Sequence, residues 1–141
     1  MCSSDLEFTA LDVNTNGVMD FTGSDRITQS VADVVNDATL GNVRRTRTYV
    51  WPTSGVNQSV LIGEIRVSAN GLHSWSIVWN GSASVTNRSV TAYIPASGLR
   101  IVTATAPDGS TTVTTNQYGR TLSVTRQIGR ASCRERVCLA V

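Results

Sequence analysis

The residues from Asp12 to Asp20, DVNTNGVMD, form the pattern with the clearest chemistry in this sequence. Oxygen-bearing side chains stand at its first, third, fifth and ninth positions, and a glycine stands at the sixth. With this spacing, side-chain oxygens and one backbone carbonyl can converge on a hard cation such as calcium, and the glycine permits the sharp turn. The predicted ligands are Asp12, Asn14, Asn16, the carbonyl of Val18, and Asp20.

This segment resembles the front half of an EF-hand or dockerin calcium loop, with one departure. The twelfth position, where such loops carry a bidentate glutamate, is Gly23, so Asp25 would have to complete the ligand shell. The alternative is a metal-free turn in which Asp and Asn side chains hydrogen-bond to their own backbone. We favour the metal-free turn; calcium, if bound, would be held with the weak affinity of extracellular sites.

Four aromatic residues could form a platform on which a ligand stacks. Alternation along a strand puts two of them on one face of the run from Val43 to Trp51, together with Arg45 and Arg47. The other two share a face of the run from Leu72 to Trp79. Rings on a sheet can stack on a sugar or a base, but arginines more often simply lie over them. The candidate residues are Tyr49, Trp51, Trp75 and Trp79.

The sequence offers little for catalysis. Its one histidine, His73, lies in mid-strand beside an aromatic residue, where a packed side chain is expected rather than a base. Glu64 is the only acid in the strand that contains it, and we expect a surface ion pair with Arg66, two residues on. No nucleophile elbow, zinc-protease motif or phosphate-binding glycine loop occurs. We therefore expect no catalytic residues and no enzyme.

The two ends of the chain do not resemble parts of a domain. Residues 1–6 and 128–141 resemble translated sequencing-adaptor sequence, and we interpret them as an artefactual leader and tail. All three cysteines lie there: Cys2, Cys133 and Cys138. The segment 7–127 has no cysteine or lysine, and its nine arginines against eight acids give 9 − 8 = +1. This balance argues against a nucleic-acid partner, and no apolar run is long enough for a membrane span.

Glycines and β-branched runs divide this segment into strands. Asn70-Gly71 and Asp108-Gly109 are hairpin signals, because tight turns need positive φ. Good helix formers are scarce, although the SVADVV run from Ser30 could begin a short helix. We predict an all-β antiparallel meander of about eight strands: 26–35, 43–51, 59–69, 72–79, 87–94, 99–106, the run after Gly109, and 120–126.

The last hairpins carry a short motif. An Asp-Gly turn is followed nine residues later by an aromatic residue, then Gly-Arg and a leucine: Asp108, Gly109, Tyr118, Gly119, Arg120 and Leu122. This motif resembles the YD repeat of the RHS family, except that the aspartate expected after Tyr118 is missing. Together with the succession of strands, it identifies the segment as similar to RHS repeat arrays.

The resemblance implies a β ribbon that forms part of a hollow shell around a C-terminal cargo domain, often a toxin, in a secreted or cell-surface bacterial protein. The expected partners are neighbouring β-repeats of a longer chain, because such units bury their apolar faces against one another. The sequence leaves two other functions open. One is a carbohydrate- or ligand-binding β-sandwich that uses the four aromatic residues. The other is a weak calcium-binding adhesin module.

Overall fold

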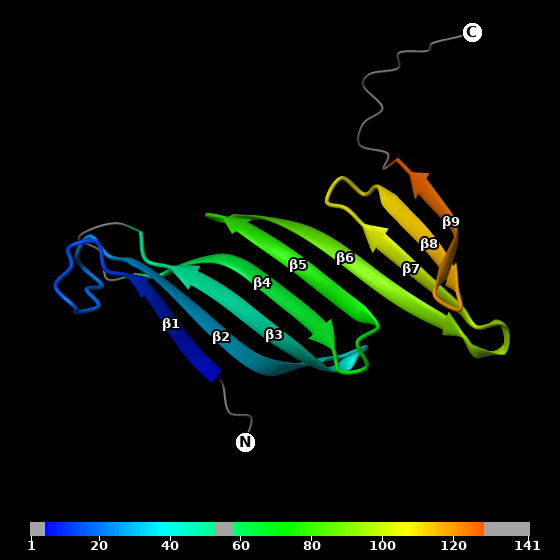
Figure 1. Cartoon of the computed structure of the whole chain (residues 1–141), viewed down its shortest axis with the longest axis horizontal. Coiled ribbons are helices and arrows are strands. Elements are labelled where there is room, and N and C mark those ends of the chain that lie inside the picture. The colour runs from blue at the N-terminus through cyan, green and yellow to red at the C-terminus, as the bar shows by residue number, and fades with distance from the viewer. Residues whose placement is uncertain (1–4, 53–57, 129–141) are drawn as a thin grey trace, which may run out of the picture. The chain divides into compact units, whose positions relative to one another are not determined.

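The structure of the protein is a computed structural model that describes residues 5–52 and 58–128. Nine antiparallel strands follow one another in an open sheet in the order of the sequence, which confirms the predicted all-β meander (Figure 1). They are β1 Asp5–Leu11, β2 Arg26–Asp37, β3 Gly41–Val50, β4 Val60–Ser68, β5 His73–Asn80, β6 Ala83–Ile94, β7 Leu99–Thr105, β8 Thr111–Gln117 and β9 Arg120–Gln127. A short 3₁₀ turn, η1 Pro95–Ser97, joins β6 to β7.

The ninth strand is β1, which the sequence did not reveal. It begins at Asp5 and Leu6, residues of the predicted leader, and pairs them with Ala32 and Val31 of β2. The SVADVV run belongs to β2 rather than to a helix. Residues 1–4, residues 129–141 of the predicted tail with its two cysteines, and residues 53–57 of the predicted loop after β3 lie outside the described residues.

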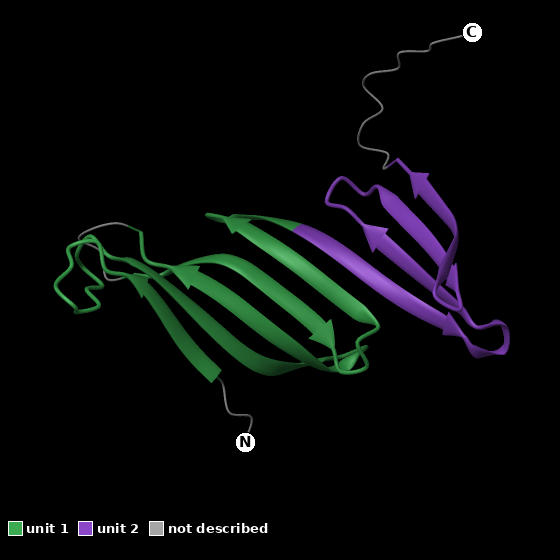
Figure 2. Ribbon diagram, in the orientation of Figure 1, with its two compact units in different colours: residues 1–85 green, residues 86–141 purple. Residues whose placement is uncertain are grey.

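The chain divides into two compact units, residues 1–85 and residues 86–141, called unit 1 and unit 2 below (Figure 2). In unit 1, the strand register aligns one row of residues across five strands: Leu6, Val31, Arg47, Glu64 and Ile77. Paired residues project from the same face of a sheet. This face also carries the ring residues of β3 and β5, so we call it the aromatic face of unit 1.

Very little of the described chain is buried. Three apolar side chains among residues 5–52 and 58–128 are buried, namely Ile27, Val43 and Ile77, and all three belong to unit 1. Trp51, whose backbone N–H bonds to the carbonyl of Ile27, packs edge-on against Phe21 at 5.1 Å between ring centroids and lies 5.9 Å from Phe8. A one-layer sheet can shelter only those side chains that its own twist and neighbouring large side chains cover.

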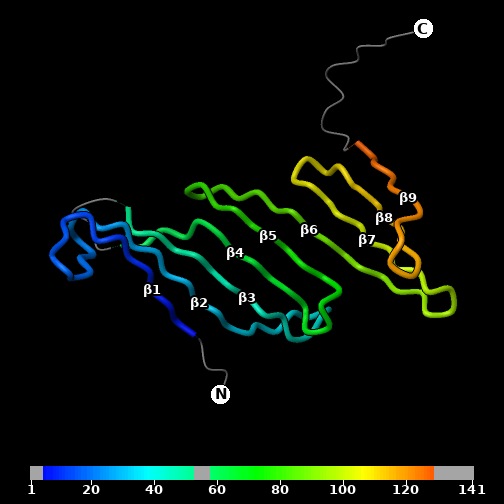
Figure 3. Tube along the Cα trace, viewed as in Figure 1, coloured from blue at the N-terminus to red at the C-terminus, as the bar shows by residue number. Residues whose placement is uncertain are grey.

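Aspartate and asparagine side chains close several turns. Oδ1 of Asp37 accepts hydrogen bonds from the backbone N–H groups of Thr39 and Leu40, at 2.9 and 3.0 Å, before β3 begins. Oδ1 of Asn70 similarly accepts the N–H of Leu72 at 3.0 Å. Such side-chain bonds stabilise the turn locally, before any contact between distant strands exists. The alternating strands and their reversals can be followed along the trace in Figure 3.

Two turns at one end of unit 2 contact each other. Tyr118 has φ of 47°, a left-handed conformation that is rare for a large residue, and it precedes Gly119 with φ of 82°. The tyrosine ring lies over Gly98, where an added Cβ would be 2.6 Å from Cε1 of the ring. Beside it, Nε2 of Gln117 donates a hydrogen bond of 2.9 Å to the carbonyl of Ser97. The β8–β9 turn therefore packs against the β6–β7 turn.

Substituting Gly98 tests the contact between the Tyr118 ring and this glycine. We expect Gly98→Ala to destabilise unit 2 by about 2 kcal/mol, because alanine is strained at φ of 63° and its methyl group displaces the ring. Gly119→Ala is the matched control, since its φ is also positive but an added Cβ would meet nothing within 4 Å. Amide hydrogen exchange of β6 to β9 measures both. Equal losses in the two variants would show that the ring contact contributes nothing.

Candidate functional site

The structure brings the predicted calcium ligands around one exposed turn. Oδ2 of Asp12 accepts the N–H of Gly17 at 2.7 Å, and Oδ1 of Asn14 accepts the N–H of Asn16 at 3.1 Å. Oδ1 of Asn16 in turn accepts the N–H of Val18 at 2.8 Å. These are side-chain to backbone bonds of the kind that the metal-free alternative predicts.

The other two acids of this loop are also engaged by backbone groups. Oδ1 of Asp20 accepts the N–H of Thr22 at 2.9 Å, and this bond is the main reason that the pKa of Asp20 lies below its ordinary value. Asp25 is buried, and its two oxygens accept the N–H groups of Val13 at 3.1 Å and Asp20 at 3.0 Å. Within the described part of the chain, no three His, Cys, Asp or Glu residues are grouped to hold a metal ion.

Calcium titration distinguishes the two interpretations of the loop. We expect neither saturable heat nor a rise in Tm on adding millimolar calcium, because the loop's oxygens already accept backbone hydrogen bonds and Gly23 supplies no twelfth-position carboxylate. Calorimetry and thermal unfolding of the full chain measure both quantities. Saturable heat that disappears in Asp12→Asn would instead support the calcium-binding adhesin.

The four candidate stacking residues lie on the aromatic face of unit 1, and all four are half-buried. Trp75 stacks on His73 of the same strand, with ring centroids 6.0 Å apart and an interplanar angle of 18°. The guanidinium carbon of Arg47 lies 5.9 Å from the centre of the Tyr49 ring. Trp51 packs in the cluster with Phe8 and Phe21 described above. The rings of Tyr49, Trp51 and Trp75 thus contact neighbouring side chains, and none of the four candidates is fully exposed.

An ion-pair network crosses the same face. Asp33 of β2 accepts two hydrogen bonds from Arg45, from Nε at 2.8 Å and from Nη2 at 2.6 Å, and one from Nη2 of Arg47 at 3.0 Å. The bond from Arg45 is the largest cause of the lowered pKa of Asp33. Asp33 lies directly opposite Arg45 in the β2–β3 register, which places the carboxylate within reach of both arginines.

Glu64 and Arg66 do form the expected ion pair, but the expectation that both lie at the surface is wrong, because Glu64 is buried. Glu64 is 5 % exposed and accepts a hydrogen bond from Nε of Arg66, whose side chain is 41 % exposed. The residues paired with Glu64 on the neighbouring strands explain its burial. Glu64 lies on the aromatic face between Arg47 and Ile77, where large side chains cover it. The apolar Ile65, on the opposite face, is 55 % exposed.

The network makes the stability of unit 1 depend on pH. Because the pKa of Asp33 is lowered on folding from 3.8, its stabilisation is complete at pH values above 3.8 and is lost as the pH falls through the lower folded value. We expect Asp33→Asn to cost about 1 kcal/mol at neutral pH and to flatten the loss of stability in acid. Urea unfolding followed by tryptophan fluorescence at pH 7 and pH 3 measures the free energy of unfolding on both sides of the titration of Asp33. An equal loss of stability between these pH values in the variant and the original protein would contradict the prediction.

Three buried nitrogens on the aromatic face have no hydrogen-bond partner among the described residues: Nε of Arg47, Nδ1 of His73 and Nε1 of Trp79. A buried polar atom without a partner is costly, so a missing partner is expected near each: an acceptor for Arg47 and Trp79, and a donor or an acceptor for His73. His73 stacks on Trp75 and forms no cluster with carboxylates in the described part of the chain.

The repeat-like motif residues fall on the last hairpins of unit 2. Asp108 and Gly109 form the β7–β8 turn, where Oδ1 of Asp108 accepts the N–H of Ser110 at 2.8 Å. Leu122 lies in β9 at a register shift and is 57 % exposed. Sequence reasoning missed Asp33 and the aromatic pair Phe8 and Phe21. The first could have been found from hairpin symmetry, since a turn at 38–40 pairs Asp33 with Arg45.

No family model matches the chain, and neither a curated protein nor a solved structure matches it. None of the described residues forms a helix long and apolar enough to cross a membrane.

Proposed function

We propose that the chain is a structural β-repeat segment of a larger RHS-like secreted or cell-surface protein and performs no catalysis of its own. The observation that supports this most is the one-layer sheet with three buried apolar side chains among the described residues. A sheet normally buries at least one face against another layer, and the proposed source of that cover is the rest of a longer chain.

The outer strands support the same proposal. Leu6 and Leu11 of β1 are 56 % and 61 % exposed, and Leu122 and Val124 of β9 are 57 % and 62 % exposed. These strands stand at the two ends of the strand order, where exposed apolar edges favour pairing with further strands. Neighbouring β-repeats are the proposed partners, and bacterial cell-surface display around a C-terminal cargo domain is the proposed setting.

The aromatic face supports a polypeptide cover rather than a sugar platform. Its stacking candidates are half-buried, and the buried nitrogens of Arg47, His73 and Trp79 lack hydrogen-bond partners among the described residues. Polar side chains or loop carbonyls of a second layer would supply those partners. Exposed, coplanar rings would have favoured the carbohydrate-binding β-sandwich instead.

The uninterrupted reading frame around this segment tests the proposal. We expect further Tyr-Gly-Arg-Leu units on both sides, and a longer chain that includes them should bind less of a hydrophobic dye per residue than this chain, because it buries the exposed strands. The control is dye binding of each chain in denaturant. A flanking frame without such units, or a monomeric 141-residue chain that binds no dye and unfolds cooperatively, would overturn the proposal.

A further inference from the structure

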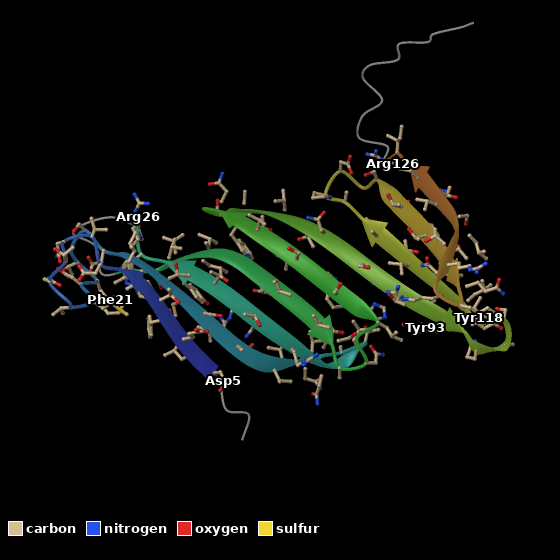
Figure 4. All side chains as sticks on the ribbon, viewed as in Figure 1. Asp5, Phe21, Arg26, Tyr93, Tyr118 and Arg126 are labelled. Carbon is tan, nitrogen blue, oxygen red and sulfur yellow. The ribbon has the colours of Figure 1, made fainter. Side chains whose placement is uncertain are left out.

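Unit 2 contains a cavity of about 590 Å³ beside the Tyr118 turn. It forms where β6 ends, β7 begins and β8 ends, and the residues that matter here are Tyr93, Gly98, Arg100, Asn116 and Tyr118. Figure 4 labels both tyrosines at this end of the unit. The register places Tyr93 opposite Arg100 and Arg100 opposite Asn116, so these three side chains share one face and form a row across three strands.

The cavity offers an open aromatic ring. One side of the Tyr118 ring rests on Gly98, yet the residue is 83 % exposed, so the other ring face is open to solvent. Tyr93 is 58 % exposed. Tyr118 also holds its position in a left-handed backbone conformation, with φ of 47°, which costs free energy for a large side chain. Exposed tyrosines beside a cavity are typical of binding surfaces.

The cavity also offers donors without acceptors. Arg100 is exposed and forms no ion pair in the described part of the chain. Oδ1 of Asn116 accepts a hydrogen bond of 2.8 Å from the hydroxyl of Thr121, which leaves the amide NH₂ group as a donor. A guanidinium and an amide side by side match a carboxylate flanked by hydroxyl groups, because arginine binds carboxylates in a bidentate geometry.

We infer that this cavity binds an oligosaccharide of the uronic-acid class. Arg100 pairs with the sugar carboxylate, Asn116 donates to a neighbouring oxygen, and the pyranose ring stacks on Tyr118 with Tyr93 beside it. An acidic peptide fits less well, because peptides add along unpaired strand edges, whereas this cavity lies at turns where β6, β7 and β8 are already paired. The site is independent of the structural role proposed above.

Titration of the full chain with trigalacturonate, followed by calorimetry and amide NMR shifts, tests the inference. We expect saturable binding with Kd of about 1 mM, since the site is shallow, and shifts confined to the cavity residues. Arg100→Gln should weaken binding about tenfold, and Arg100→Lys should restore only part of it. Tyr118→Asn removes the ring while tolerating the left-handed turn, and it should weaken binding by a similar factor.

Matched controls decide between outcomes. Arg126→Gln makes the same charge change on β9, opposite Thr112 and away from the cavity, and should leave binding unchanged. The neutral trisaccharide of galactose should bind much more weakly. No saturable binding of trigalacturonate, equal losses in Arg100→Gln and Arg126→Gln, equal affinity for the neutral sugar, or tighter binding of triglutamate would each overturn the inference. The last result would assign the cavity to an acidic peptide.

Discussion

Replacing Ile27 with alanine is expected to lower the free energy of unfolding of unit 1 by about 3 kcal/mol. Ile27 is 2 % exposed and is one of three buried apolar side chains among the described residues. The backbone N–H of Trp51 also donates a hydrogen bond of 3.1 Å to the carbonyl of Ile27, which places the strand beside the aromatic cluster. A one-layer sheet has no second layer that could collapse into the space left by the lost methyl and methylene groups.

Urea unfolding followed by tryptophan fluorescence measures the effect, because Trp51, Trp75 and Trp79 all report on unit 1. Ile65→Ala is the matched control: this residue lies in the middle of β4 but is 55 % exposed, so its loss should cost about 1 kcal/mol or less, mostly from β propensity. Ile27→Val should cost about 1 kcal/mol. If Ile27→Ala and Ile65→Ala had the same effect, the buried position of Ile27 would be wrong.

Glu64→Gln should cost about 2 kcal/mol, although the two side chains have nearly the same volume. The buried carboxylate of Glu64 accepts a hydrogen bond from Arg66, and with Asp33 it balances three arginines on one face. Removing one member of a buried pair leaves the other charge uncompensated, which typically costs several kcal/mol. We discount that figure because the Arg66 side chain is 41 % exposed and regains some hydration.

Glu7→Gln is the control for this substitution, since Glu7 lies exposed on β1 and forms no ion pair in the described part of the chain. Its effect on the free energy of unfolding should be within about 0.5 kcal/mol. The cost of Glu64→Gln should also persist in 1 M salt, chosen because the Debye length is then about 3 Å and exposed pairs are screened. If the cost of Glu64→Gln vanished in high salt, the result would instead support the exposed surface pair that the sequence predicts.

Local signals in the sequence determined most of the strands. Alternating β-branched runs and the glycines at Gly71 and Gly109 predicted eight of the nine strands and their order, because turn chemistry acts over a few residues. The missed strand, β1, begins in the stretch that resembles adaptor sequence, at Asp5 and Leu6. Its pairing depends on β2, which begins fifteen residues after β1 ends (26 − 11 = 15). The sequence therefore determined the class of fold and the order of the hairpins, but not where the meander starts.

The tertiary structure alone decided which face of the sheet is covered. Alternation divides β4 into two faces, and hydrophobicity favours burying Ile65 rather than Glu64, yet the structure does the reverse. The reason is nonlocal: strand pairing puts Glu64 between Arg47 and Ile77, whose side chains cover it, and puts Ile65 beside Thr46 and Ser76, which are too small to do so. The same pairing creates the contact of Tyr118 with Gly98 and the row of Tyr93, Arg100 and Asn116, because each joins residues from separate strands or turns.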